Sequence, residues 1–198
     1  MHRLKPQASN NAGFSLLEIT VVVSILLVLG AMLVPTMMTV IANSRLRGGA
    51  TNLSGILQGC RMTAVKQNRT MAVHFTVISA GPLAYVKDAT IGSPSVSSTD
   101  PQVELGAPVS LVSSLSGPGA PSVALDNTIL GFTPQTGDPS FNPRGSPCSY
   151  SGGNCTNYGF VYYLTDSRPL GKSGWAAVTI SPAGRITKWF WNGYAWAN

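Results

Sequence analysis

Charged residues are scarce in this chain, and histidines are scarcer still. Only 10% of the 198 residues are charged, and the two histidines are His2 and His74. The sequence contains no cluster of a serine, a histidine and an acidic residue, and no two carboxylates have the spacing of a general acid and base. We therefore expect a protein that is not an enzyme and that needs no metal or cofactor.

One long apolar segment contains a single charge. Residues 14–41 form a run of 28 residues in which only Glu18 is ionisable. This length is enough to span a hydrocarbon core of roughly 30 Å. An unpaired carboxylate in lipid costs about 2.5 to 3.5 kcal/mol, so intramembrane charges usually have partners. Cutting the chain after Gly13 would supply one, because the new amino group on Phe14 lies about one helical turn from Glu18.

The residues before this segment do not form an ordinary secretory signal. Residues 1–13, MHRLKPQASNNAG, are polar, and they lack the apolar h-region of a signal peptide. Arg3 and Lys5 favour a cytoplasmic N-terminus, although Arg45 and Arg47 flank the other end of the segment. We expect the chain beyond the segment to lie on the outer side of the membrane. A signal anchor with an incidental glutamate is the alternative.

The segment from residue 13 to residue 35, GFSLLEITVVVSILLVLGAMLVP, resembles the processing and assembly segment of type IV prepilins and type II secretion pseudopilins. The resemblance implies cleavage between Gly13 and Phe14 by a prepilin peptidase and N-methylation of Phe14. It places Glu18 at the fifth mature position and Pro35 at the twenty-second, as assembly residues of a helix that packs into a filament core. It also implies single-pass storage in the inner membrane, a periplasmic C-terminal domain, and other pilins or pseudopilins as partners.

A helical pattern continues beyond the apolar segment, through residues 42–68. Apolar residues recur there at alternating spacings of four and three, which predicts an amphipathic helix. Cys60 is part of this stripe and is expected to be a small buried hydrophobe rather than a reactive thiol. Pro35 should kink or locally melt the helix. The stripe consists of Leu46, Ala50, Leu53, Leu57, Cys60 and Ala64. Gly30 and Ala31 could be packing positions in a bundle of apolar helices, with simple tolerance of the glycines as the alternative. The glycines that weaken the helix are Gly30, Gly48, Gly49, Gly55 and Gly59.

The remaining residues, 69–198, predict one β-rich domain. The chain contains 21 glycines and 14 prolines, a loop-rich composition typical of exported domains rather than of cytosolic enzymes. Alternating apolar residues predict strands at 70–78, 83–89, 103–112, 123–132, 158–165 and 176–181. Polar, Pro-rich loops are expected at 92–101 and 113–122. The expected fold class is α+β, with a long helix laid against antiparallel strands.

Two cysteines bracket a short loop. Cys148 and Cys155 enclose SYSGGN, whose two glycines let the chain turn back. On the outer side of a membrane the pair would be oxidised, and closing this loop contributes roughly 2.5 kcal/mol in the chain-entropy model. A metal site would need more ligands, and neither His2 nor His74 is close in sequence. We therefore expect a disulfide.

Other polar residues are expected to have local roles. His74 is predicted to be a solvated or hydrogen-bonded residue of the first strand rather than a ligand. Three aspartates stand beside turn residues and are expected to make local turn hydrogen bonds. They are Asp126, Asp138 and Asp166.

The C-terminal segment, AAVTISPAGRITKWFW and the residues after it, predicts a hairpin followed by an aromatic tail. Pro182 presets the φ angle of a turn and Gly184 can take the left-handed conformation, so the chain reverses over 181–184. The aromatic residues, beside Arg185 and Lys188, could stack bases and neutralise phosphates, or they could cap the core of the sheet. Capping is favoured. The aromatic residues are Trp189, Trp191, Tyr194 and Trp196.

The globular half resembles the GspH/FimT family of minor pseudopilins. The resemblance rests on GFTPQTGDPSFNPRG, on the strand that follows it, and on the SPAGRI hairpin. It implies a place in the tip complex of a type II secretion pseudopilus or a role as a minor pilin. Some pilus members bind DNA through a Gly-Arg-x-Arg motif on the terminal hairpin. Gly184 and Arg185 match this motif, but the fourth position is Thr187, and Lys188 is displaced by one residue, which turns it to the other face of a strand.

The expected protein is a structural minor pilin or pseudopilin with a type IV pilin-like fold. Residues 1–13 would be the leader, 14–41 the transmembrane and assembly helix, 42–68 its amphipathic continuation and 69–198 the globular domain. Loss of the leader lowers the net charge from +6 to about +4, which permits an anionic partner without demanding one. A pilus-tip module that binds extracellular DNA is the alternative.

Overall fold

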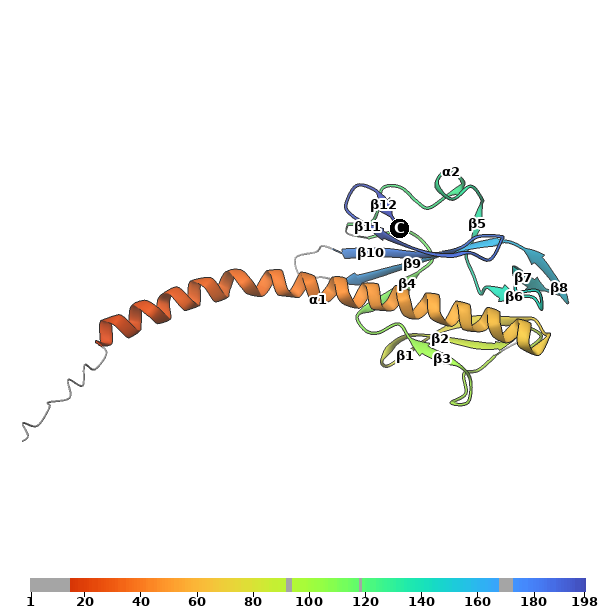
Figure 1. Ribbon diagram of the computed structural model, residues 1–198, viewed down its shortest axis with the longest axis horizontal. Coiled ribbons are helices and arrows are strands. Elements are labelled where there is room, and N and C mark those ends of the chain that lie inside the picture. The colour runs from red at the N-terminus through yellow and green to blue at the C-terminus, as the bar shows by residue number, and fades with distance from the viewer. Residues whose placement is uncertain (1–14, 92–93, 118, 168–172) are drawn as a thin grey trace, which may run out of the picture. The chain divides into compact units, whose positions relative to one another are not determined.

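The computed structural model describes residues 15–91, 94–117, 119–167 and 173–198, without the side chains of residues 32–36, 167 and 173. The chain divides into two compact units, Met1–Thr39 and Val40–Asn198. Figure 1 shows the helices and strands with their labels. Each unit is described by itself.

The helix α1 runs from Leu16 to Gln67 and has 52 residues. The carbonyl of Ser15 accepts hydrogen bonds from the N–H groups of Glu18 and Ile19, at 3.0 and 3.2 Å, which closes the first turn. The helix ends where Asn68 takes a left-handed φ of 51°, a common way to stop a helix. α1 stays helical through residue 35, so the local melting predicted at Pro35 is not observed.

In the first unit, α1 exposes apolar side chains all around its circumference. The exposed residues occupy nearly every helical position, so no single face of this part of the helix is polar. Glu18 is exposed in the first turn. Among the residues that the structure describes, no helix is both long and apolar enough to cross a membrane. The exposed large apolar residues from 16 to 29 are Leu16, Leu17, Ile19, Val21, Val22, Val23, Ile25, Leu26, Leu27, Val28 and Leu29.

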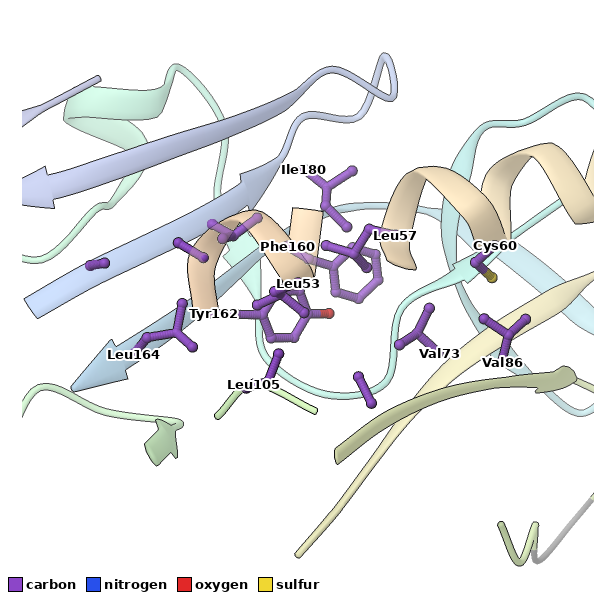
Figure 2. Close-up of a cluster of buried hydrophobic side chains, with 14 of the residues drawn as sticks. Leu53, Leu57, Cys60, Val73, Val86, Leu105, Phe160, Tyr162, Leu164 and Ile180 are labelled. Carbon is purple, nitrogen blue, oxygen red and sulfur yellow. The ribbon is translucent and has the colours of Figure 1, made fainter. Parts of the chain in front are cut away.

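In the second unit, α1 buries a single stripe. All six residues of the predicted stripe are at most 3% exposed, and five of them are 0% exposed. Figure 2 shows Leu53, Leu57 and Cys60 of this stripe among side chains from the strands. The prediction of an amphipathic helix with a buried Cys60 is confirmed.

The first sheet is antiparallel and has the strand order β3-β2-β1-β6-β7-β8. Its central hairpin pairs Met71 with Asp88 and Ile78 with Gly81. The strand bounds are β1 Met71–Ile78, β2 Gly81–Asp88, β3 Gln102–Glu104, β6 Ser140–Phe141, β7 Pro147–Ser151 and β8 Asn154–Asn157.

The second sheet has the order β12-β11-β10-β9-β4. All its neighbours along this path are antiparallel, and β5 pairs with β9 in parallel. The strand bounds are β4 Val109–Val112, β5 Pro134–Gln135, β9 Gly159–Ser167, β10 Ser173–Ile180, β11 Ile186–Trp191 and β12 Trp196–Ala197.

Both sheets contribute to one hydrophobic core with the stripe of α1. Val73 and Val86 come from the first sheet, and Phe160, Leu164 and Ile180 come from the second (Figure 2). A smaller cluster covers the other face of the second sheet, around Leu125, Val161, Tyr163, Trp175 and Ala177. The protein is therefore an α+β fold in which a helix packs on antiparallel sheets, as the sequence predicted.

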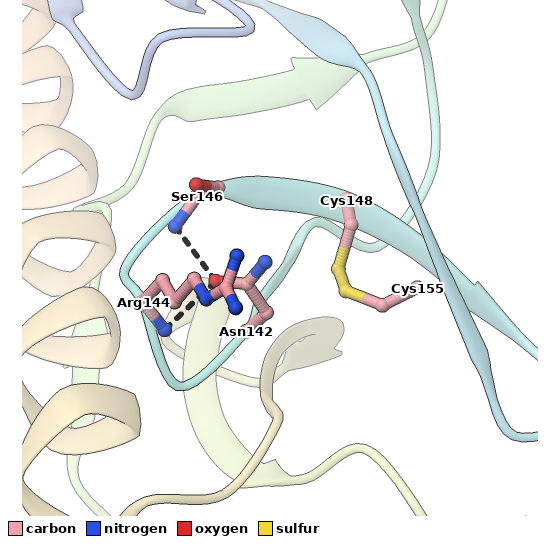
Figure 3. Close-up of a disulfide and its surroundings, with 5 residues drawn as sticks. All are labelled: Asn142, Arg144, Ser146, Cys148 and Cys155. Carbon is pink, nitrogen blue, oxygen red and sulfur yellow. Dashed lines mark hydrogen bonds between the residues drawn. A yellow bond between two sulfur atoms is a disulfide. The ribbon is translucent and has the colours of Figure 1, made fainter.

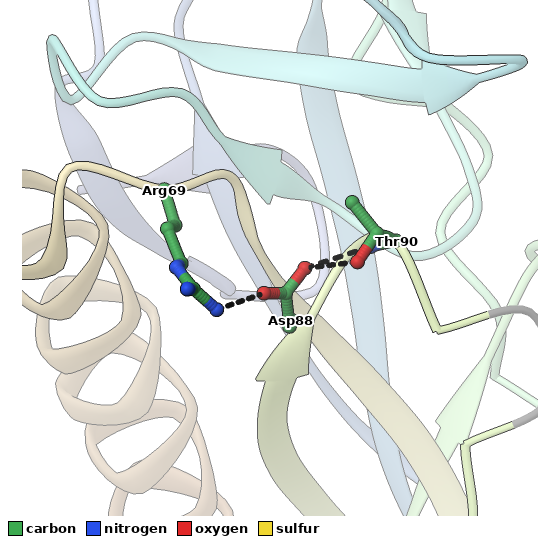
Figure 4. Close-up of polar contacts among 3 residues, drawn as sticks. All are labelled: Arg69, Asp88 and Thr90. Atoms are coloured by element: carbon green, nitrogen blue, oxygen red, sulfur yellow. Dashed lines mark hydrogen bonds and ion pairs between the residues drawn. The ribbon is translucent and has the colours of Figure 1, made fainter.

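Polar contacts connect the C-terminal end of α1 to the β1–β2 hairpin. Oδ1 of Asp88 accepts hydrogen bonds from the backbone N–H of Thr90 at 2.9 Å and from its hydroxyl at 2.7 Å. Nη1 of Arg69 lies 3.5 Å from Oδ2 of the same carboxylate. Figure 4 shows that the three side chains meet just beyond the C-terminal end of the helix. The pKa of the Asp88 carboxyl is lowered, chiefly by the hydrogen bond from the backbone N–H of Thr90 and next by the bond from its hydroxyl. These bonds outweigh burial, which raises the pKa, and Arg69 lowers it further.

The predicted strand at 103–112 is wrong as one element. It forms β3 in the first sheet and β4 in the second. Between them, Gly106 takes a φ of 82° and its carbonyl accepts from the N–H of Val109 at 2.9 Å. A turn with a left-handed glycine interrupts the extended backbone. The apolar residues before the turn therefore belong to the first sheet, and those after it belong to the second.

The predicted strand at 123–132 is also wrong, since its centre forms the short helix α2, Asn127–Leu130. The carboxylate of Asp126 accepts from the N–H groups of Thr128 and Ile129 and caps the N-terminus. Gly131, at a φ of 75°, caps the other end. Aspartate is a strong N-cap residue. Here the cap starts a helix, although the alternation of apolar residues favours a strand.

Candidate functional site

The terminal hairpin turn forms as the sequence predicted. The N–H of Gly184 donates to the carbonyl of Ser181 at 2.7 Å, and Gly184 has a φ of 83°. The N–H of Arg185 donates to the hydroxyl of Ser181 at 3.1 Å. This turn joins β10 to β11 and places the Arg185 side chain in solvent.

A second glycine turn joins β6 to β7. Oδ1 of Asn142 accepts from the N–H groups of Arg144 and Ser146, each at 3.0 Å (Figure 3). The N–H of Gly145 donates to the Asn142 carbonyl at 2.8 Å, and Gly145 has a φ of 77°. Arg144 is exposed at the tip of this turn.

Arg61 of α1 joins the two turns. Its Nη1 donates to the carbonyl of Gly184 at 3.0 Å. A Cβ at Gly145 would lie 3.1 Å from Nε of Arg61, and a Cβ at Gly184 would lie 3.3 Å from the carbonyl oxygen of Gly145. The two segments that carried the resemblance in the globular half, FNPRG and SPAGR, therefore meet at one helical arginine.

This meeting point is cationic. Arg61, Arg144 and Arg185 form the group that we call the cationic junction. Among the described residues, the ion pairs between side chains join Arg69 to Asp88, His74 to Asp138 and Lys87 to Asp100, and none includes Arg61, Arg144 or Arg185. Such a surface can bind an anion or a polyanion.

Lys188, the second predicted candidate for DNA binding, does not join this group. Its Nζ lies 3.4 Å from the hydroxyl of Thr51 on α1. Ile186 and Phe190, two residues away on each side along β11, pack against the main core. Lys188 therefore lies on the helix-facing side of β11, opposite to Thr187, as the displacement by one residue predicted.

The C-terminal aromatic residues mainly cover the second cluster. Trp189, Trp191 and Trp196 pack against it. The indole N–H of Trp189 donates to the hydroxyl of Thr179 at 2.9 Å, and that of Trp196 donates to the carbonyl of Val123 at 2.7 Å. The predicted capping role is confirmed for these three, whereas Tyr194 is 91% exposed.

The three aspartates have different roles. Asp126 makes the predicted local bonds as the N-cap of α2. Oδ2 of Asp138 instead lies 2.6 Å from Nδ1 of His74, which makes His74 a hydrogen-bonded strand residue. Asp166 is buried and accepts from the N–H of Gly174 on β10 at 2.7 Å. For Asp138 the predicted local turn bond is wrong, because the packing of the strands brings His74, 64 residues earlier, closer. The bond to Asp166 joins β9 to β10.

The disulfide between Cys148 and Cys155 is present, with a Cα–Cα distance of 5.3 Å. It links β7 to β8, as Figure 3 shows. Cys60 is free and buried, and burial raises the pKa of its thiol to about 12. No group of three potential metal ligands occurs among the described side chains.

The processing residues Gly13 and Phe14 lie outside the described residues, as does the side chain of Pro35. Glu18 is described, and it is the acidic residue in the first turn of α1. No sequence motif indicates a role for Arg61, because its partner is a backbone carbonyl 123 residues away. Its place beside the buried stripe is the one available clue.

No protein family, curated protein or solved structure matches this chain. The functional proposal therefore rests on the residues and their geometry.

Proposed function

We propose that this chain is a structural minor pilin or pseudopilin of a type II secretion pseudopilus or a type IV pilus. Residues 14–41 hold it in the inner membrane as a single pass, and the globular domain lies in the periplasm. A prepilin peptidase cuts between Gly13 and Phe14 and methylates Phe14. The mature chain then enters a filament beside other pilins or pseudopilins.

The contrast between the two parts of α1 carries this proposal. In the first unit apolar side chains are exposed all around the helix, whereas in the second unit one stripe is buried. A helix that is apolar all around needs cover from lipid or from neighbouring helices. Storage in a membrane followed by packing into a filament core supplies both.

Glu18 and the disulfide support the same proposal. The amine that cleavage creates on Phe14 offers Glu18 a partner, either in its own chain or in a neighbour. A disulfide between Cys148 and Cys155 suits an oxidising compartment such as the periplasm.

Cleavage is tested by Gly13→Leu, which should block processing. Mass spectrometry of the membrane protein should then show the leader retained, and the unaltered chain should begin at Phe14. A mature N-terminus at any other residue contradicts the family assignment.

Assembly is tested by Glu18→Ala, with Glu104→Ala as the matched control. Removing Glu18 should leave insertion and cleavage intact, because it removes the single charge of the segment, and it should lower recovery in sheared filament fractions by leaving a neighbour's amine unpaired. Glu104 lies on β3 of the globular domain, and its removal should not change recovery. Equal recovery of both variants contradicts the pairing role of Glu18.

DNA binding at a pilus tip is the second candidate, favoured by the cationic junction. Arg144 and Arg185 are exposed on adjoining turns. Retardation of duplex DNA should be weak at physiological salt and should strengthen as salt falls, because phosphate contacts release counterions. Arg144→Ala and Arg185→Ala should reduce it, whereas Lys188→Ala should not. Tight binding at physiological salt that both arginine substitutions abolish would place the DNA function first.

A further inference from the structure

An apolar groove runs beside β4, the last strand of the second sheet. β4 pairs with β9 from Val109–Asp166 to Val112–Tyr163. On its other side the described part of the chain provides no pairing strand. A cavity of about 480 Å³ lies between this side of β4 and the β1–β2 hairpin, and a second of about 270 Å³ lies at the C-terminal end of β4, where β9 also lines it; the two share Phe75 and Leu111 in their linings. We call the two cavities together the β4 groove.

The backbone of β4 offers hydrogen-bonding groups to the groove. The N–H of Val109 donates to the carbonyl of Gly106 at 2.9 Å, and therefore points away from β9. Successive residues of an antiparallel strand direct their backbone groups to alternate sides. Ser110 and Val112 accordingly face β9, and the N–H and C=O of Leu111 face the groove. An open strand edge of this kind is a template for another strand.

The floor of the groove is apolar. Phe75 and Leu111 are partly buried and pack on the main core. Val77 stands at the rim with 79% of its surface exposed. Side chains of an added strand would alternate between the two faces, so every second one would lie on this floor.

One end of the groove is acidic. Asp138 is the single charged residue among the described residues that line the two cavities. Its carboxylate is 46% exposed, and it lines the smaller cavity together with Ser113, which follows the C-terminal end of β4. Oδ2 of Asp138 lies 2.6 Å from Nδ1 of His74, and the exposed part of the carboxylate can take a cation as a second partner at this end.

We propose that the β4 groove binds an extended segment of another polypeptide, which pairs with β4 as an added antiparallel strand. Antiparallel addition sets the N-terminal end of the segment at the C-terminal end of β4, beside Asp138. The segment has apolar residues at alternate positions and a lysine or arginine near its N-terminal end. Backbone hydrogen bonds to Leu111 supply affinity, and the apolar floor and Asp138 supply selectivity.

The test uses the full-length chain in detergent micelles and a fluorescent peptide, Lys-Val-Ser-Val-Ser-Val, followed by fluorescence anisotropy. The peptide should bind saturably. A version with methylated backbone nitrogens cannot donate to an edge strand and should not bind. A version with aspartate in place of the lysine should bind about three- to fivefold more weakly, the effect of one exposed ion pair.

Three variants of the chain complete the test. Val77→Glu should abolish peptide binding, because it puts a charge on the apolar rim. Met62→Glu changes an equally accessible apolar residue of α1, 72% exposed, and should leave binding intact. Asp138→Asn should bind the lysine and aspartate peptides equally. Circular dichroism checks that all three variants are folded.

Two sets of results would overturn the proposal. One is an absence of saturable binding, or binding that tolerates backbone methylation or Val77→Glu. The other is dimerisation of the peptide-free chain that Val77→Glu abolishes, since the occupant would then be a second copy of this chain.

Discussion

The guanidinium of Arg61 donates a hydrogen bond to the carbonyl of Gly184, 3.0 Å away and 123 residues later in the chain. The same side chain lies against Gly145, whose absent side chain leaves room for it. One helical residue thereby fixes a turn of the first sheet and a turn of the second. The relative position of Arg144 and Arg185 depends on this contact.

Arg61→Ala should destabilise the protein by about 1.5 to 3 kcal/mol, the value of a hydrogen bond to a charged donor. The Gly184 carbonyl would lose its donor, and the two turns would lose a shared contact. Urea unfolding measures the change. Met62→Ala, at an exposed neighbouring position, is the control and should have little effect. Equal effects of the two substitutions would contradict the joining role of Arg61.

Two neighbouring glycines of α1 should respond oppositely to alanine. A Cβ at Gly49 would lie 2.9 Å from the carbonyl oxygen of Leu105, whereas a Cβ at Gly48 meets nothing within 4 Å. Gly49→Ala should therefore cost about 1 to 3 kcal/mol through overpacking. Gly48→Ala should gain about 0.5 to 1 kcal/mol from helix propensity. Thermal unfolding of both variants measures the difference, and destabilisation by Gly48→Ala would contradict it.

The sequence was most informative where a pattern was long. The stripe from Leu46 to Ala64 repeats over several turns, and every member is buried. The hairpin at 181–184 was predicted from the conformational limits of proline and glycine, which hold in any environment. Both predictions rest on local chemistry.

The sequence was least informative where tertiary contacts decide. β5 and β6 have two residues each, too few for a periodic pattern. The break between β3 and β4 at Gly106 and the helix N-cap at Asp126 each depend on one residue. In both places this residue outweighs the alternating apolar pattern around it, which favours a strand. His74 and Asp138 are 64 residues apart in sequence, and no local pattern relates them.

Acid should remove the contribution of Asp88 to stability. Its pKa lies below the ordinary carboxyl value, chiefly because the backbone N–H of Thr90 donates to it. A carboxyl group with a lowered pKa stabilises the folded protein fully above the ordinary value, and this stabilisation disappears as the pH falls through the lowered one. Asp88→Asn should therefore be less stable than the unaltered chain at neutral pH, by under about 1 kcal/mol, and equally stable in acid. Urea unfolding across this pH range measures both values, and a difference that persists in acid would contradict the assignment.

Loss of the disulfide should destabilise the β7–β8 hairpin. Replacing both Cys148 and Cys155 by serine should cost roughly 2.5 kcal/mol, because the unfolded chain regains the freedom of the loop. A reducing agent should lower the free energy of unfolding of the unaltered chain by a similar amount, seen as a shift of its unfolding midpoint. It should not shift that of the double variant, and a shift there would point to another reducible contact.

The thiol of Cys60 should be inert in the folded protein. It is 0% exposed, and burial raises its pKa to about 12. The thiolate is the reacting form, so iodoacetamide at pH 8 should leave Cys60 unmodified in the native protein and alkylate it after denaturation. Mass spectrometry of the digested protein measures both states. Because the native reaction requires opening of the core, Leu53→Ala should accelerate it, whereas the exposed substitution Met62→Ala should not. Rapid native alkylation with a rate that follows hydroxide concentration, unchanged by Leu53→Ala, would show that the thiol is accessible without opening.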